Sequence, residues 1–110
     1  MDTNSLFSLE GKTALVTGGS RGIGLMIAKG FIAQGAKVYI SSRKAEVCDE
    51  VAAELGDNCH SLPADISTVD GCRALAEAMT AKEPKLDILV NNAGAAWGQD
   101  FEAFPEKGWD

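Results

Sequence analysis

The stretch TGGSRGIG, residues 17–24, follows the apolar run TALV of residues 13–16 and precedes a segment with helical periodicity. Three of its glycines, Gly18, Gly22 and Gly24, are spaced as G-x-x-x-G-x-G. Glycine has no Cβ, so it permits a sharp turn, lets a phosphate approach backbone N–H groups, and lets the next helix pack closely. The stretch therefore predicts a strand–turn–helix unit that holds a phosphate group, with a ligand-free glycine turn as the alternative.

Strand and helix signals alternate along the rest of the chain. The expected strands are residues 12–17, 37–41, 59–63 and 86–90, and the expected helices are 22–34, 46–55 and a third that opens with a capping box at 67–70. The apolar stripes of these helices are Ile23, Ile27 and Phe31, then Val47, Val51 and Leu55, then Cys72, Leu75, Ala76 and Met79. This alternation predicts an α/β fold, a doubly wound parallel sheet of the Rossmann type with the strand order 3-2-1-4.

Length and charge exclude several classes of protein. The chain has 110 residues, enough for a single domain over residues 1–110, and its composition is that of a globular protein. Its 10 Lys and Arg against 16 Asp and Glu give a net charge of -6, which argues against nucleic acid as a partner. No apolar run approaches the roughly 18–20 residues that span a bilayer, and the first residues lack a signal-peptide pattern. We expect a cytoplasmic protein without a membrane partner.

The cysteines and the histidine do not suggest a metal site. Cys48, Cys59 and Cys72 show no metal-ligand spacing, and His60 is the single histidine. We predict buried thiols in a reducing compartment and no bound metal.

The end of the second strand indicates which dinucleotide is bound. A site for NAD places an Asp or Glu there, roughly 20 residues beyond the glycines, to bind the ribose 2′-hydroxyl. This sequence reads ISSRK at residues 40–44, with no carboxylate. Arg43, beside Ser42, can bind a 2′-phosphate through its planar guanidinium, and Arg21 in the glycine turn can supply a second cation. We predict NADP(H) as the cofactor, the alternative for Arg43 being a solvated surface cation.

Three motifs in this order resemble the short-chain dehydrogenase/reductase family: TGGSRGIG, then Asp65-Ile66, then NNAG at residues 91–94. The similarity extends from about Leu9 to Asp110. Within the family, the segments NNAGAAWG and SSRKAEVC are most similar to NADPH-dependent 3-oxoacyl reductases, including the rhamnolipid-biosynthesis type. The resemblance implies an oxidoreductase that reduces a ketone to a secondary alcohol.

The resemblance also implies the roles of individual residues. The implied cofactor-binding residues are Gly18, Ser20, Arg21, Ile23 and Gly24 at the phosphates, Ser42 and Arg43 at the 2′-phosphate, Asp65 and Ile66 at the adenine, and Asn91, Ala93 and Gly94 at the riboses. Asp65 would accept a hydrogen bond from the adenine amine, the alternative being a turn residue before Ser67. Thr17 would join the first strand to the NNAG turn through its hydroxyl.

The catalytic residues of the family are not among these motifs. Its reaction uses a tyrosine as proton donor, a lysine four residues later and a serine, and these normally follow NNAG beyond this chain's last residue. The single tyrosine, Tyr39, has Arg43 four positions on, so we predict a packing role for it. We expect a chain truncated before the catalytic Ser, Tyr and Lys, inactive alone, from a protein that forms homodimers or homotetramers.

Two functions from different classes remain open at this point. The first is the cofactor-binding part of an NADPH-dependent ketoreductase, with 3-oxoacyl thioesters as first substrate and sugars, polyols or other small ketones as alternatives. The second is a catalytically silent NADP-binding module. Four aromatic residues near the end can form a substrate wall, a subunit contact or ordinary packing: Trp97, Phe101, Phe104 and Trp109.

Overall fold

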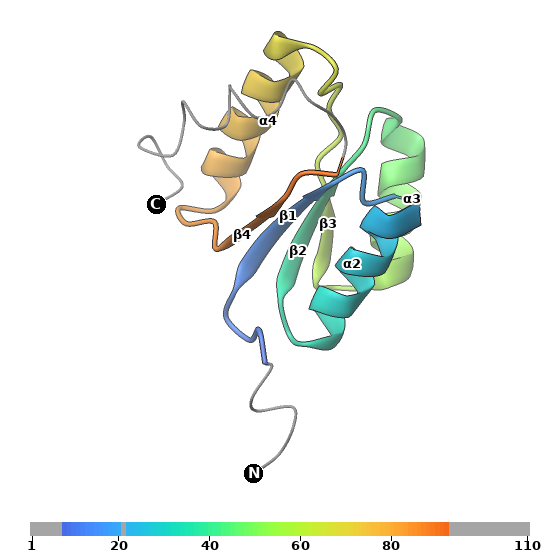
Figure 1. Cartoon of the computed structure of the whole chain (residues 1–110), viewed down its shortest axis with the longest axis vertical. Helices are drawn as coiled ribbons and strands as arrows, with labels where there is room; N and C mark the ends of the chain where they lie inside the picture. Colours follow the sequence, from blue (N-terminus) through green and yellow to red (C-terminus); the bar gives the residue numbers. More distant parts are fainter. Residues whose placement is uncertain (1–7, 21, 93–110) are drawn as a thin grey trace.

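A parallel four-stranded sheet forms the centre of the computed structural model, which describes residues 8–20 and 22–92. The strands follow the order β3-β2-β1-β4, so the predicted doubly wound α/β sheet with the order 3-2-1-4 is confirmed (Figure 1). The elements are β1 (Thr13–Thr17), α2 (Gly22–Ala33), β2 (Lys37–Ser41), α3 (Ala45–Leu55), β3 (Cys59–Ser61), α4 (Val69–Lys82) and β4 (Ile88–Val90).

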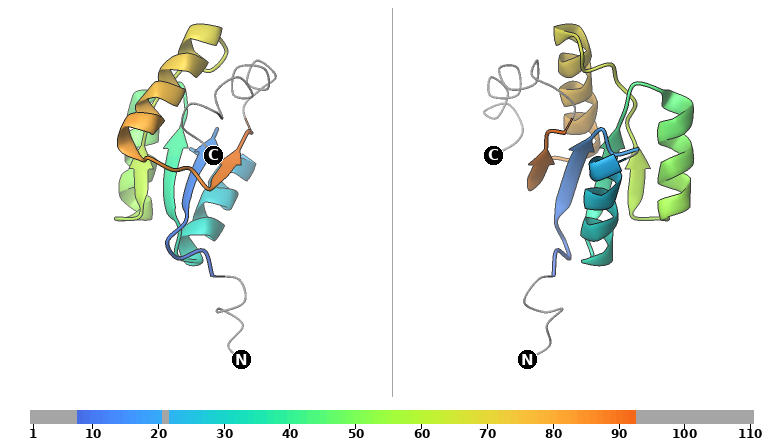
Figure 2. Two further views of the ribbon diagram at one scale, coloured as in Figure 1. Left: turned by 90° about the vertical axis from the view of Figure 1, so that its left-hand side faces the viewer. Right: turned by 45° about the vertical axis from the view of Figure 1, so that its right-hand side comes forward.

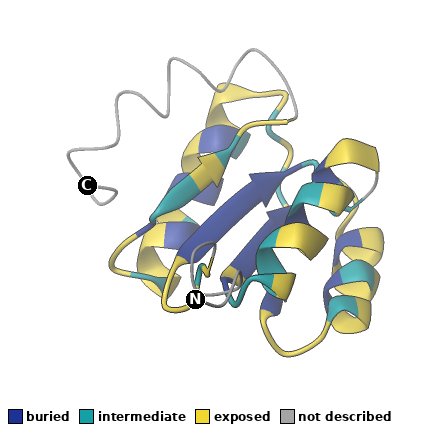
Figure 3. Ribbon diagram, turned by 60° about the horizontal axis from the view of Figure 1, so that its bottom comes forward, coloured by how far each residue is buried: buried dark blue, intermediate teal, exposed yellow. Residues whose placement is uncertain are grey.

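The helices cover the two faces of the sheet unequally. Figure 1 shows α4 on one side of the sheet and α2 and α3 on the other, and the left view of Figure 2 shows α4 and α2 on opposite sides of the strands. β1 is buried along its whole length because it has a helix layer on each side (Figure 3). Leu15 packs with Leu75 and Met79 under α4, whereas Ala14 and Val16 belong to the core beneath α2 and α3. Two apolar cores therefore hold β1 in place, and this packing fixes the position at which the turn after β1 begins.

The faces that α2 and α3 bury differ from the predicted stripes. The buried residues are Gly24 and Ala28 in α2, and Cys48 and Ala52 in α3. Ile23 is 67% exposed and Val47 is 38% exposed, so the predicted stripes are wrong at these two positions. Small side chains face the sheet because they let the helix axes approach it closely. The other predicted stripe residues are half buried against the core: Ile27, Phe31, Val51 and Leu55.

The ends of α2 and α3 lie within one residue of the predicted ones, whereas β1 is one residue shorter than predicted and β3 and β4 are each two residues shorter. β3 ends at Ser61, short of Pro63, which has no N–H group to continue the ladder. β4 begins at Ile88, and Asp87 just before it makes two bonds to Thr13: its N–H donates to the Thr13 carbonyl at 3.0 Å, and its carboxylate accepts the Thr13 N–H at 2.9 Å. Asp87, which was predicted to belong to the fourth strand, therefore contacts β1 through its side chain as well as its backbone.

The start of α4 is capped by Thr68 and not by Ser67. The Thr68 Oγ1 accepts the N–H of Gly71 at 2.9 Å, and Gly71 has no side chain to complete a capping box. The predicted inward face of α4 is confirmed, since its four residues are all buried: Cys72, Leu75, Ala76 and Met79.

All three cysteines are buried thiols, as predicted. Burial, with a smaller effect from the neighbouring Cys48, raises the pKa of the Cys59 thiol to about 11. A thiol with such a pKa carries almost no thiolate at neutral pH and is a poor nucleophile or metal ligand.

Tyr39 has the predicted packing role and also joins β2 to the end of α4. Its ring lies in the core under α4 with a 4% exposed fraction, at 5.0 Å from the ring of His60. Its hydroxyl donates to Glu83 at 2.7 Å, and the same carboxylate accepts from Lys37 at 2.7 Å. Burial and the Glu83 carboxylate raise the pKa of Tyr39 to about 12.

We expect Tyr39→Phe to reduce the sensitivity of the fold to alkaline pH. Because the Tyr39 pKa is higher in the folded chain than its ordinary value of 10.0, its contribution is complete below pH 10 and is lost as the pH rises through about 12. Urea unfolding at pH 8, 10 and 12 should therefore show a smaller loss of free energy for Tyr39→Phe than for the unchanged chain. An equal loss in both proteins would contradict the hydrogen-bonded role of the hydroxyl.

Candidate functional site

A cleft of about 660 Å³ opens where the carboxyl ends of the strands meet. Chain order reverses at this edge, because β1 has β2 on one side and β4 on the other. Open α/β sheets bind their ligands at such a switch point, and the volume suits a small organic ligand. The cleft is lined by Gly18, Ser20, Gly22, Ile23, Ser41, Ser42, Arg43, Lys44, Val47, Ala64, Asp65, Ile66, Ser67 and Asn92.

Most of the predicted site residues come together in this cleft. Those that line it are Gly18, Ser20, Ile23, Ser42, Arg43, Asp65 and Ile66. Gly24 and Asn91 are described by the structure but do not line the cleft. The predictions for Arg21, Ala93 and Gly94 lie outside the described residues, as do those for the four C-terminal aromatic residues.

The turn after β1 presents the start of α2 to the cleft. Gly18 and Gly22 have φ angles of 67° and 62°, in the left-handed region that favours glycine. The first turn of α2 contains no acidic residue, so the positive end of the helix dipole is not offset there. A Cβ built at Gly22 would have no neighbouring atom of the described residues within 4 Å. Gly22 lines the cleft, so the space beside it is part of the cleft. The turn therefore fits an anionic group such as a pyrophosphate.

Gly24 does not line the cleft but lies next to Gly18 and Asn92, which do. A Cβ at this position would overlap the carbonyl oxygen of Gly18 and would lie 2.9 Å from Nδ2 of Asn92. A Cβ at Gly18 would also approach the Asn92 amide, at 3.3 Å. Two glycines thus make the space that the Asn92 side chain occupies, and this contact fixes the turn after β1 against the residue after β4.

Asn92 lies close to the glycine turn, and it is one of seven cleft residues that were not predicted as site residues: Gly22, Ser41, Lys44, Val47, Ala64, Ser67 and Asn92. It lines the cleft, whereas its neighbour Asn91, which was predicted, does not. The NNAG motif gives the location of both, but the motif alone does not tell which amide turns toward the glycines.

Thr17 ties β1 to the end of β4, as predicted. Its hydroxyl donates to the carbonyl of Val90 at 3.2 Å and accepts the N–H of Asn92 at 2.9 Å. One buried side chain thus holds the ends of β1 and β4 together.

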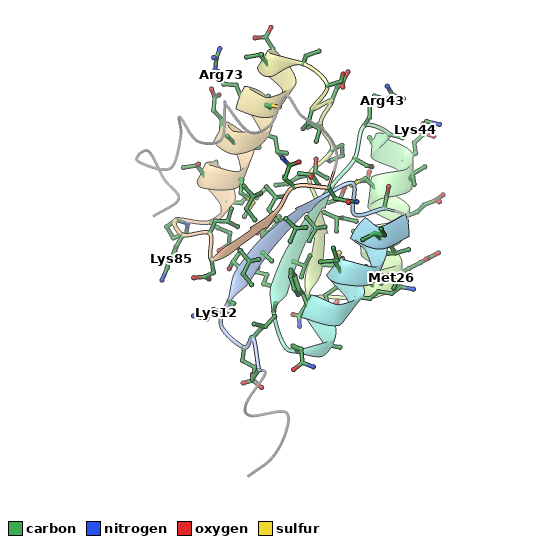
Figure 4. All side chains as sticks on the ribbon, viewed as in Figure 1. Lys12, Met26, Arg43, Lys44, Arg73 and Lys85 are labelled. Atoms are coloured by element: carbon green, nitrogen blue, oxygen red, sulfur yellow. The ribbon has the colours of Figure 1, made fainter. Side chains whose placement is uncertain are left out.

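The opposite edge of the cleft carries positive charge. Arg43 and Lys44 follow β2, and Figure 4 shows both side chains at the end of the sheet where α3 begins. The other labelled cations of Figure 4 lie elsewhere, with Lys12 and Lys85 toward the opposite end of the sheet. A cation pair at this edge is suited to a phosphate group.

Asp65 supplies a carboxylate to the same cleft. It accepts the N–H of Ser67 at 3.1 Å and its hydroxyl at 2.5 Å, so it is also the turn residue that the alternative interpretation expected. These hydrogen bonds, with a smaller attraction from Arg43, hold the pKa of Asp65 below its usual value. The group is therefore an ionised acceptor at neutral pH.

Comparison with known proteins gives the family. The sequence profile of the short chain dehydrogenases matches residues 12–110. The chain belongs to the short-chain dehydrogenase family. Members of this family are oxidoreductases that use nicotinamide cofactors.

Several characterised members are similar to this short-chain dehydrogenase chain. It is 51% identical to a rhamnolipids biosynthesis 3-oxoacyl-[acyl-carrier-protein] reductase of Pseudomonas aeruginosa, over 94% of the chain and 41% of the relative. It is 40% identical to a gluconate 5-dehydrogenase of Gluconobacter oxydans, over 100% of the chain and 44% of the relative. The chain thus spans about two-fifths of the length of these relatives.

The fold agrees with a solved structure of the family. The chain superposes on the Pseudomonas aeruginosa RhlG/NADP active-site complex with a TM-score of 0.78 and 52% identity, over 86% of this chain and 38% of that one. An L-sorbose reductase from Gluconobacter frateurii, complexed with NADPH and L-sorbose, gives a TM-score of 0.75 at 36% identity, over 81% of this chain and 35% of that one.

The described part of the chain contains no metal-binding cluster and no membrane-spanning helix. Within residues 8–20 and 22–92, no group of three or more His, Cys, Asp or Glu side chains could hold a metal ion. No helix in the same ranges is long and apolar enough to cross a membrane.

Proposed function

We propose that residues 1–110 are the cofactor-binding part of an NADPH-dependent ketoreductase. The observation that carries the proposal is the end of β2, where Ser42 and Arg43 line the cleft at the place of the carboxylate that would bind an NAD ribose. A serine hydroxyl and a guanidinium can both donate hydrogen bonds to a 2′-phosphate, whereas a carboxylate would repel it.

Each part of the cofactor would be bound by a different set of residues. The turn from Gly18 to Gly22 and the start of α2 would hold the pyrophosphate, and Asp65 and Ile66 would bind the adenine. Asn91, with Ala93 and Gly94, would lie along the riboses, and Arg21 would add a cation near the phosphates. When bound, NADPH supplies the hydride that converts a ketone to a secondary alcohol. The cleft residues would bind and orient it, and none of the described residues that line the cleft is a tyrosine that could donate the proton.

The substrate that we propose is a 3-oxoacyl thioester. The support is the 51% identity to a reductase named for a 3-oxoacyl carrier-protein substrate, compared with 40% to the gluconate dehydrogenase. Sugars, polyols and other small ketones are the competing substrates, because their enzymes share the same cofactor-binding part. We further propose that the intact protein is a cytoplasmic homo-oligomer.

We expect the chain to bind NADPH at least tenfold more tightly than NADH. One charge-assisted hydrogen bond to the 2′-phosphate contributes about 1.5–3 kcal/mol, which is a factor of roughly 10 or more in affinity. Titration calorimetry with the two reduced cofactors in one buffer would measure the ratio. Equal affinities, or tighter binding of NADH, would overturn the cofactor assignment.

The choice between an enzyme and a silent binding module needs sequence beyond Asp110. A serine followed by Tyr-x-x-x-Lys in the coding region supports the reductase, and a stop codon directly after Asp110 supports the module. The encoded protein should then oxidise NADPH with a 3-oxoacyl thioester faster than with a keto sugar. The opposite preference would contradict the substrate proposal and leave the cofactor proposal intact.

A further inference from the structure

The first turn of α4 holds the backbone of two residues that line the cleft, Asp65 and Ile66. The Thr68 Oγ1 accepts the N–H of Gly71 at 2.9 Å and donates to the carbonyl of Asp65 at 3.3 Å. The buried thiol of Cys72 donates to the carbonyl of Ile66 at 3.4 Å. Both carbonyls are therefore directed at the start of the helix, and their positions depend on how closely the helix approaches them.

Gly71 leaves the space that the Asp65 carbonyl occupies. A Cβ built at Gly71 would overlap the carbonyl oxygen of Asp65 and would lie 2.7 Å from its carbonyl carbon and 3.0 Å from Oγ1 of Thr68. The first two of these atoms belong to backbone, so a side chain at this position would fit only if the segment before α4 moved. Glycine is a poor helix residue, and its presence here is explained by this close approach. Gly71 itself does not line the cleft, so it would act on a ligand through Asp65.

The direction of the Asp65 carbonyl decides where the next N–H group points. The peptide bond between Asp65 and Ile66 is trans, and a trans peptide directs its C=O and N–H groups to opposite sides. Because the carbonyl points to the start of α4, the N–H of Ile66 points away from that helix. The Asp65 carboxylate is held by the N–H and the hydroxyl of Ser67. A backbone donor and a carboxylate acceptor therefore come from adjacent residues of a segment that lines the cleft.

We propose that Gly71 is a positioning residue for recognition of the adenine base, acting through the peptide between Asp65 and Ile66. The inference rests on the proposed binding of adenine by these two residues. Adenine presents a ring-nitrogen acceptor and an amine donor on neighbouring atoms, which match a backbone N–H and a carboxylate. A side chain at position 71 would displace the peptide and turn its N–H away from the ring nitrogen. Recognition of the base would then weaken, although no residue that contacts the base had been changed.

The test uses NADPH and its hypoxanthine analogue, which differ only in the base. The analogue carries a ring N–H and a carbonyl where adenine has the acceptor and the amine, so it mismatches both protein groups. We expect the unchanged chain to bind NADPH about 10-fold more tightly than the analogue in titration calorimetry. In Gly71→Ala, the affinity for NADPH should fall about 5- to 10-fold, whereas that for the analogue should stay within about twofold. A substitution that only destabilised the fold would lower both affinities by the same factor and leave their ratio unchanged.

Gly30→Ala is the matched control for the added methyl group. Gly30 is an exposed glycine of α2, and a Cβ at this position would have open space around it. The ratio of the two affinities should therefore be the same in Gly30→Ala as in the unchanged chain.

Two variants of Thr68 test the same contact without a Cβ at position 71, and they decide the question if Gly71→Ala does not fold. Thr68→Val removes the hydroxyl that donates to the Asp65 carbonyl, so the ratio should fall about 2- to 5-fold. Thr68→Ser keeps this hydroxyl and should keep the ratio of the unchanged chain.

The outcomes distinguish this inference from the proposed function. If the unchanged chain binds neither dinucleotide, the proposed function fails and the role of Gly71 fails with it. If it binds both equally, the adenine contacts of Asp65 and Ile66 are wrong and so is the role of Gly71, while the preference for NADPH over NADH rests on its own measurement. If it prefers NADPH and Gly71→Ala keeps that ratio, only the role of Gly71 is overturned. An equal fall of the ratio in Gly30→Ala, or an unchanged ratio in Thr68→Val, would also overturn it.

Discussion

Gly24→Ala is expected to lower the free energy of unfolding by about 2–4 kcal/mol and to abolish measurable nucleotide binding. The new Cβ would overlap the carbonyl oxygen of Gly18 and come within 2.9 Å of Nδ2 of Asn92. The first of these atoms belongs to the backbone of Gly18, whose N–H donates to the carbonyl of Ser41 at 2.7 Å, so it cannot move without shifting the turn after β1. The displaced turn would then move the N–H groups at the start of α2 away from the pyrophosphate.

A matched control in the same helix, Gly30→Ala, is expected to change the free energy of unfolding in the opposite direction. Gly30 is exposed within α2, and a Cβ there would have no neighbour within 4 Å. Gly30→Ala should therefore raise the free energy of unfolding by about 0.5–1 kcal/mol, because alanine loses less backbone entropy in a helix. Urea unfolding of both variants and calorimetry with NADPH would measure the two effects. A Gly24→Ala protein as stable as Gly30→Ala would contradict the described contact.

The topology could be predicted from sequence because each unit carries its own local signal. The turn of residues 17–24, the apolar strands and the helix caps are all read within short windows, and right-handed crossovers leave few arrangements for them. The predicted dinucleotide site rested on the glycine turn and on Ser42 and Arg43 after the second strand, and residues of both segments line the cleft.

The faces of the helices could not be predicted in the same way. Ile23 and Val47 look like core residues by periodicity, but the chain buries Gly24 and Cys48 beside them. Close helix packing favours the small side chain, and hydropathy does not weigh that effect. The two exposed apolar residues instead line the cleft.

Contacts between distant parts of the chain were the other limit. The role of Asn92 depends on the space left by Gly18, far away in sequence, and no local pattern gives that distance. The absence of a side-chain cap at the start of α3 is visible only when the boundary of that helix is known. The predictions for Arg21, Ala93 and Gly94 lie outside the described residues and stay predictions.

Ser42→Asp is expected to reverse the preference between the two cofactors. An aspartate at the end of β2 can accept the two hydroxyls of an NAD ribose, and it would repel a 2′-phosphate and pair with Arg43. Loss of one charge-assisted hydrogen bond and addition of a repulsion together amount to about 3 kcal/mol, so the ratio of NADPH to NADH affinity should fall about 100-fold.

The fold should tolerate this change, which makes the binding result interpretable. The Ser42 hydroxyl makes a local bond to the carbonyl of Lys44 at 3.4 Å, whereas the bond of Ser42 to Ala64 at 3.0 Å uses the backbone carbonyl, which the substitution keeps. Ala53→Glu adds one negative charge to an exposed position of α3 outside the cleft and is the matched control. If both variants change the ratio equally, the effect comes from overall charge. If Ser42→Asp alone leaves it unchanged, the 2′-phosphate does not lie at the end of β2, and the proposal that this cleft selects NADPH through Ser42 and Arg43 is wrong.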